Sequence, residues 1–328
     1  MERLGSALGF PFPFAHFSLF PFVPPGSWQR RMIVIPEPFE YHVAHSLEEA
    51  SRLVAQFGTD GKILAGGHSL VPLMKFRLAA PKYLVDISRL GDLKYIREDG
   101  ERLEIGALTT HYEVESSELL KAKCPLLPET AAEIGDVQVR NRGTIGGSIS
   151  HADPAGDWPA PILALDADIK AVSTRGERWI AARDLFVELL TTALEGDEIL
   201  TAIRVPTLGA RTGSAYLKLH HPASGYAMVG VAAVVSLDEQ GHIAKASVGI
   251  TGVGPKAYRA KAVEEGLQGK PASPKRLAEA SAHAAEGIEV NSDLYASAEY
   301  RTHLATVYTR RALERAIERA GQPASELP

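Results

Sequence analysis

The chain has 328 residues, 45% of them hydrophobic, and carries a formal net charge of −5 at pH 7. This length predicts two domains, because a single hydrophobic core rarely extends over so many residues. The acidic balance, without any long block of lysine and arginine, argues against nucleic acid as a partner. The single cysteine, Cys124, excludes an intrachain disulfide and an all-cysteine iron–sulfur cluster within this chain.

Membrane insertion and secretion find no support in the sequence either. No apolar run reaches the roughly 18 residues that a membrane-spanning helix needs, so we expect no membrane span and a cytoplasmic protein. The aromatic segments 10–14 and 17–22 are broken by prolines and flank His16, which is a poor fit to a secretory signal. We therefore expect residues 1–31 to be a disordered leader, with Met32 opening the native protein.

A first domain is predicted over residues 32–208, beginning with a helix and two strands. Ser46 and Glu49 have the capping-box spacing that opens a helix, and apolar residues recur behind them at helical spacing. Residues 62–65, apolar from Ile63 on, predict a buried strand that leads into two adjacent glycines, and a second strand is expected over 83–87. This order of elements is typical of an α/β unit.

The rest of the first domain is expected to be mixed. Asp99-Gly100 suits a tight hairpin turn between two short strands. Residues 112–134 have a helical character, and a strand over 197–206 ends the domain.

A second domain, residues 209–328, has strands followed by helices. Strands are expected over 214–219, 227–237 and 242–251, and helices over 257–267, 274–286 and 298–320. Segregated strands and helices indicate an α+β domain that is distinct from the first.

The stretch from Ala65 to Leu70 places two glycines and a hydroxyl residue directly after a predicted strand. Glycine tolerates positive φ and lets another molecule approach bare backbone, so Gly66 and Gly67 can turn the following amides towards a ligand. Consecutive exposed N–H groups form an anion site even without a cationic side chain, and Ser69 adds a hydroxyl. Most Gly-Gly steps are only turns, so this stretch alone favours a plain turn over a phosphate site.

A second stretch has the same combination of adjacent glycines and hydroxyl residues. Gly146 and Gly147 are flanked by Thr144 and Ser148, and Gly143 lies just before them. Two phosphate-sized cradles in one chain predict a diphosphate that is held from both sides.

Several side chains near these stretches have simpler interpretations. His151, Asp153 and Asp157 are ligand types of a divalent-metal site, although the glycine-rich motif directly upstream favours a phosphate-bearing cofactor. Asp157 alternatively caps a helix that starts at the following Trp-Pro pair. His68 is expected to fix its turn rather than to act as an acid or base.

These stretches resemble the two signatures of the flavin-binding medium subunit of molybdenum hydroxylases, a group that includes aerobic carbon monoxide dehydrogenase and bacterial aldehyde and xanthine dehydrogenases. The similarity continues through segments 216–218, 222–226 and 297–301, so it covers essentially residues 32–320. It implies an α+β fold: a two-part FAD-binding domain of the vanillyl-alcohol oxidase or PCMH type, followed by a smaller α+β C-terminal domain like that of the carbon monoxide dehydrogenase flavoproteins.

The resemblance also implies which residues hold FAD. Both glycine motifs would cradle its diphosphate, Asp157 would hold the ribityl or adenosine side, and Tyr216 would cover the isoalloxazine ring with Lys218 near it. By residue type alone, Tyr216 is most simply a core residue and Lys218 a solvated charge. Ser148 stands where the family commonly has asparagine, so its own contact would reach less far. The implied cofactor-binding residues are Ile63, Ala65, Gly66, Gly67, His68, Ser69, Leu70, Ile134, Thr144, Gly146, Gly147, Ser148, Asp157, Leu200, Tyr216 and Lys218.

The function implied by the resemblance is electron transfer, with no catalytic residue and no metal ligand in this chain. Substrate would be oxidised at a molybdenum cofactor in a large partner subunit. Electrons would pass through [2Fe–2S] clusters of a small partner subunit to FAD in this chain, and then to an external acceptor. A dimer of heterotrimers is expected. The alternatives are a stand-alone flavoprotein oxidoreductase of the same fold, and a nucleotide- or metal-binding module without redox function.

Overall fold

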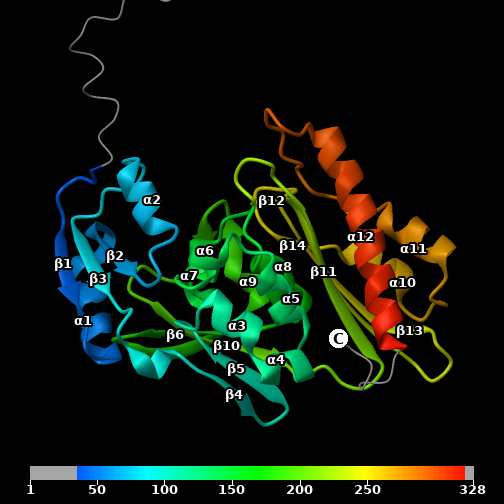
Figure 1. The fold of residues 1–328 in the computed structure, drawn as a ribbon, viewed down its shortest axis with the longest axis horizontal. Helices are drawn as coiled ribbons and strands as arrows, with labels where there is room; N and C mark the ends of the chain where they lie inside the picture. The colour runs from blue at the N-terminus through cyan, green and yellow to red at the C-terminus, as the bar shows by residue number, and fades with distance from the viewer. Residues whose placement is uncertain (1–34, 322–328) are drawn as a thin grey trace, which may run out of the picture.

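The computed structural model describes residues 35–321, so the expected leader, residues 1–31, lies outside the described residues. The described chain begins with a small three-stranded parallel sheet, at the left of Figure 1. Its strands are β1 (Glu40–Val43), β3 (Tyr83–Asp86) and β2 (Gly61–Leu64), in that order. Helix α1 (Leu47–Phe57) packs against β3 and β2, and the 3₁₀ turns η2 (Gly58–Asp60) and η3 (Gly91–Leu93) and the helix α2 (Leu70–Lys75) complete this part.

Local sequence signals explain how α1 begins. Ser46 is its N-cap, and the Ser46 hydroxyl accepts the backbone N–H of Glu49 at 3.1 Å, as predicted. The Glu49 carboxylate accepts the backbone N–H of His45 at 2.8 Å, one residue before the position that a capping box would use.

The second part of the first domain is a five-stranded antiparallel sheet covered by short helices. The strand order is β4-β5-β10-β6-β7. The strands are β4 (Ile96–Asp99), β5 (Arg102–Gly106), β6 (Asp168–Ser173), β7 (Gly176–Ala181) and β10 (Ile199–Pro206), with a separate hairpin of β8 (Phe186–Glu188) and β9 (Thr191–Thr192). The helices are α3 (His111–Ser116), α4 (Glu118–Lys123), α5 (Leu126–Ala132), α6 (Val137–Arg140), α7 (Ile145–His151), α8 (Pro159–Ala164) and α9 (Ala182–Leu185).

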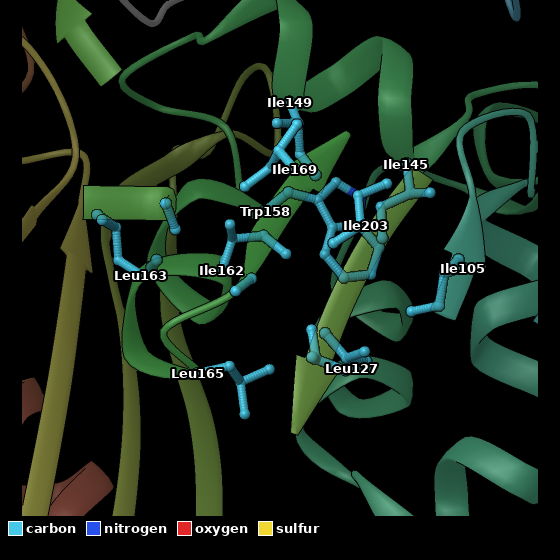
Figure 2. Packing of buried hydrophobic residues seen from close by; sticks show 14 of the residues in the cluster. Ile105, Leu127, Ile145, Ile149, Trp158, Ile162, Leu163, Leu165, Ile169 and Ile203 are labelled. Carbon is cyan, nitrogen blue, oxygen red and sulfur yellow. The ribbon is translucent and has the colours of Figure 1, made fainter. Parts of the chain in front are cut away.

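Trp158 lies at the centre of the hydrophobic core of this part. Its side chain is fully buried, and Figure 2 shows Ile145, Ile149 and Ile203 gathered around the indole ring. Because α7, α8 and β10 all contribute to this cluster, the second glycine stretch is fixed to the core through its own helix.

The C-terminal part is an antiparallel sheet of β11 (Thr212–His220), β12 (Ala227–Leu237), β13 (Ile243–Thr251) and β14 (Tyr258–Arg259). Helix α12 (Ala298–Ala320) packs along β11 and β12, and α10 (Lys261–Leu267) and α11 (Pro274–Ser281) lie beside it on the same side, at the right of Figure 1. The final helix has the bounds that its sequence predicts. The helix expected over 257–267 begins later, because Tyr258 and Arg259 pair with β13 instead.

This sheet is buried on both faces, which explains its long apolar strands. Tyr216 and Ala232 belong to the core of the first domain, whereas their neighbours Ala215, Val231 and Ala233 belong to the C-terminal core. Helix α8 of the first domain packs against β12 and β13 opposite α12. One sheet therefore joins both halves, and residues of β11 come within reach of the glycine-motif domain.

Within residues 35–321, no helix is both long and apolar enough to cross a bilayer. The fold confirms the predicted α+β class.

Cys124 is expected to be unreactive in the folded protein. Its side chain is fully buried at the end of α4, and burial raises the pKa of the thiol to about 12. The thiolate is the nucleophilic form, so a thiol-modifying reagent should label Cys124 only after unfolding. Labelling of the native chain at the rate of a free thiol would contradict this placement.

Candidate functional site

The first glycine stretch forms a tight loop between β2 and α2. Gly67 has a φ of 77°, in the left-handed region that glycine adopts readily. The His68 ring donates from Nδ1 to the carbonyl oxygen of Gly66 at 3.1 Å, because that carbonyl can only accept. His68 therefore fixes the turn, as the sequence predicted.

The loop presents an uninterrupted run of backbone donors. Among residues 35–321, no acceptor takes the backbone N–H groups of the five residues from Gly66 to Leu70. Successive unpaired amides around a turn form a concave site for an anion. The chemistry of this donor set fits a phosphate or diphosphate group.

The two glycine stretches are in direct contact. A side chain on Gly66 would collide with the carbonyl oxygen of Arg142 and approach the Cα atom of Gly143 to 3.0 Å. On the other side, a side chain on Gly147 would lie 4.0 Å from the Cβ atom of Ala65. Segments that are about 80 residues apart in the chain therefore converge on one place.

The second stretch differs from the predicted bare-backbone cradle. It forms helix α7, whose N-cap Thr144 accepts the backbone N–H of Gly147 at 3.2 Å. The N–H groups of Ile145, Gly146 and Ser148 also bond to carbonyl oxygens within the protein. Gly146 is needed because a side chain there would run into Ala107. The second stretch thus supplies a closely packed wall, and the run of successive amides without an acceptor belongs to the first.

His111 lies beside this junction in a single tautomer. The Trp158 indole N–H donates to His111 Nδ1 at 3.1 Å, and the indole has no acceptor to offer, so the proton of the neutral ring is on Nε2. A side chain on Gly143 would lie 2.7 Å from that Nε2 atom. The backbone N–H of His111 also donates to the carbonyl oxygen of Gly143, at 3.0 Å.

Asp157, Tyr216 and Lys218 form a buried cluster with one another. The Asp157 carboxylate accepts the Tyr216 hydroxyl at 2.6 Å and the Lys218 ammonium at 2.9 Å, and the Lys218 side chain is fully buried. Lys218 also donates to the carbonyl oxygen of Glu133 at 2.9 Å. Burial raises the pKa of Asp157 despite the adjacent ammonium, and it raises the pKa of Tyr216 well above its ordinary value. The cluster joins β11 to the first domain.

Comparison with known proteins decides the family. Residues 37–208 match the family model described as the FAD binding domain in molybdopterin dehydrogenase, and residues 214–316 match the carbon monoxide dehydrogenase flavoprotein C-terminal domain. The chain belongs to the family of FAD-binding medium subunits of molybdopterin dehydrogenases. The resemblance inferred from the two glycine motifs is therefore confirmed.

Relatives of this medium-subunit family match over nearly their whole length. The carbon monoxide dehydrogenase medium chain of Hydrogenophaga pseudoflava is 41% identical over 87% of this chain and 99% of its own. Subunit alpha of the 6-hydroxypseudooxynicotine dehydrogenase complex of Paenarthrobacter nicotinovorans is 39% identical over 87% of this chain and 96% of its own. A solved structure of the Hydrogenophaga pseudoflava carbon monoxide dehydrogenase aligns with a TM-score of 0.85 at 41% identity, covering 87% of this chain and 99% of that chain.

The remaining residues implied by the medium-subunit family are spread over two cores. Ile134 and Leu200 pack in the core of the first domain, around Trp158, whereas Ile63 packs in the small core under the three-stranded sheet. Asp157 does not cap the helix that follows it, because α8 has Trp158 as its N-cap and no side-chain cap. Within residues 35–321, no three side chains of metal-binding type come together.

Residue patterns missed two features that lie beside the second glycine stretch and the loop that follows it. His111 gave no signal, since a single histidine in a helical segment has no characteristic spacing. Tyr226 is 43% exposed and lines a cavity of about 220 Å³ with Ala155, His221 and Arg301, beside the loop that follows α7. Only its place in a segment of family similarity pointed to Tyr226.

The stability of the flavin-free medium subunit is expected to fall in mild acid because of His111. Burial, with the charges of His68 and Arg140, lowers the His111 pKa from 6.5 to about 4. The unfolded chain binds this proton at higher pH, so stability is fully present above about pH 6.5 and is lost as the pH falls towards about 4. Urea unfolding should show a loss of about 2 kcal/mol between about pH 7.5 and about pH 5 from this residue. The same pH dependence in a His111→Gln variant would contradict this assignment.

Proposed function

We propose that this chain is the electron-transferring flavoprotein subunit of a molybdenum hydroxylase. Bound FAD would supply redox chemistry that accepts electrons from [2Fe–2S] clusters in a small partner subunit and passes them to an external acceptor. Substrate oxidation would take place at molybdenum in a large partner subunit. The three subunits would form a heterotrimer, and two heterotrimers would associate as a dimer.

The observation that carries this proposal is the meeting of the two glycine stretches around a run of free amides. The amides of residues 66–70 would hold the diphosphate, with Ala65 and the side of α7 at Gly147 as the opposing wall. The donor set is backbone, so it suits an anionic group irrespective of pH. The remaining implied residues are proposed to line the rest of the cofactor.

The cysteine content supports a separate partner subunit for the iron–sulfur clusters. With Cys124 as the single cysteine, no all-cysteine iron–sulfur cluster can be built here. Two of the relatives are named as a medium chain and as one subunit of a dehydrogenase complex, which favours the same role for this chain. The chain would thus depend on partners for the oxidation itself.

Purification of the chain alone and with the products of its neighbouring genes tests this proposal. Alone, the chain should retain FAD but show no substrate-dependent bleaching of the flavin. Together with its partners, it should form a complex that contains molybdenum and iron and whose flavin is bleached by substrate. Substrate turnover by the isolated chain would instead indicate the stand-alone oxidoreductase, and a stable complex without molybdenum or iron would contradict the assignment.

A further inference from the structure

His111 has a backbone contact and a side-chain contact at the point where the two glycine stretches meet. Its backbone N–H donates to the carbonyl oxygen of Gly143 at 3.0 Å. Its ring stands against Gly143, with Nε2 2.7 Å from where a side chain on that residue would begin. Gly66 approaches the Cα atom of Gly143 from the loop that carries the free amides. Gly143 is therefore placed between the His111 ring and the first loop.

The hydrogen-bonding partners of His111 determine what the ring can offer. Trp158 occupies Nδ1 as a donor, so Nε2 carries the proton and can only donate. Within residues 35–321, no acceptor takes this Nε2 proton. The ring is only 4% exposed, but Nε2 is not among the enclosed polar atoms that lack a partner in the described part of the chain, so this donor reaches the surface. An acceptor from outside the chain can therefore approach it.

We propose that His111 donates from Nε2 to the diphosphate of the bound dinucleotide, and that Trp158 acts as a positioning residue by holding the tautomer that makes this possible. This inference rests on the proposed FAD site. It adds a neutral side-chain donor to the backbone amides of residues 66–70, on the opposite side of Gly143. Because Trp158 lies in the hydrophobic core, the donor is held by the core itself rather than by the loop.

Matched substitutions at His111 separate this role from packing. His111→Leu removes both hydrogen bonds, whereas in His111→Gln the amide oxygen can accept from Trp158 while the amide N–H still donates. We expect titration calorimetry of the flavin-free full chain to show about 10- to 100-fold weaker binding of FAD and of ADP for the leucine variant. Losing one hydrogen bond to a charged group raises a dissociation constant by about that factor. The glutamine variant should recover most of this loss, and the affinity for riboflavin, which has no phosphate, should be the same in all three proteins.

Nitrogen-15 spectra of the unsubstituted chain provide a test that does not depend on a variant folding. The His111 ring should show a protonated Nε2 before ligand is added, and the Nε2 signal should shift on addition of ADP but not of riboflavin. An unchanged Nε2 signal, or FAD affinity in the folded leucine variant equal to that of the parent, would overturn the role of His111 while leaving the FAD site intact. A parent chain that binds neither FAD nor ADP would overturn both the inference and the proposed function.

Discussion

Replacing Gly66 with alanine is expected to weaken FAD binding by up to about 100-fold while leaving most of the fold in place. The added methyl group would collide with the carbonyl oxygen of Arg142, which is backbone and cannot rotate away as a side chain would. Overpacking of this kind costs about 1–3 kcal/mol. If that cost falls on the FAD-bound state, the dissociation constant of FAD rises by a factor of up to about 100. The two glycine stretches would have to separate, and the diphosphate would lose the opposing wall.

The measurement is the dissociation constant of FAD for the flavin-free chain, followed through quenching of flavin fluorescence. Gly196→Ala is a matched control, because a side chain at Gly196 would meet no atom within 4 Å. Circular dichroism spectra of both variants should match that of the parent. An alanine at Gly66 that binds FAD as tightly as the parent would show that the junction of the stretches does not form the cofactor site.

Asp157→Asn is expected to destabilise the chain by about 3–5 kcal/mol, the largest loss of stability that we predict. The substitution leaves the Lys218 ammonium without its counter-ion in a fully buried position, and such unpaired charges are costly. The Tyr216 hydroxyl also loses a charged acceptor. Since Asp157 joins β11 to the first domain, the loss should be visible as weaker docking of the two halves.

Chemical unfolding of the flavin-free chain measures this effect directly. The double variant Asp157→Asn/Lys218→Met is the control, because it removes the buried ammonium together with its partner. It should regain much of the lost stability, because both charges of the buried pair are removed together and no uncompensated charge stays in the interior. Destabilisation of the double variant equal to the sum of the two single variants would contradict an ion pair between these residues.

Much of the C-terminal domain could be predicted from the sequence because its elements have strong periodicity. The helix Ala298–Ala320 has a continuous apolar stripe, and the strands Ala227–Leu237 and Ile243–Thr251 are long and apolar. In contrast, β7 is largely exposed and rich in charge, so residues Gly176–Ala181 carry no strand pattern. Its pairing with β6 is a property of the assembled sheet.

The site shows the same division between local and tertiary information. The residues of the first loop could be predicted because two glycines directly after a strand indicate a turn whose backbone amides can face a ligand. Helix α7 could not be predicted, because adjacent glycines disfavour a helix. The requirement for glycine at position 146 comes from its close packing on Ala107, which is a tertiary contact. The contact of Asp157 with Tyr216 spans 59 residues, and no local pattern in the sequence predicts such a partner.

A crystal structure of the FAD-loaded chain is the most direct test of the central claim that the two glycine stretches hold one dinucleotide. We expect diphosphate oxygens within hydrogen-bond distance of the backbone N–H groups of residues 66–70, with α7 at Gly147 on the other side. A diphosphate bound elsewhere on the chain, with these N–H groups facing only solvent, would contradict it.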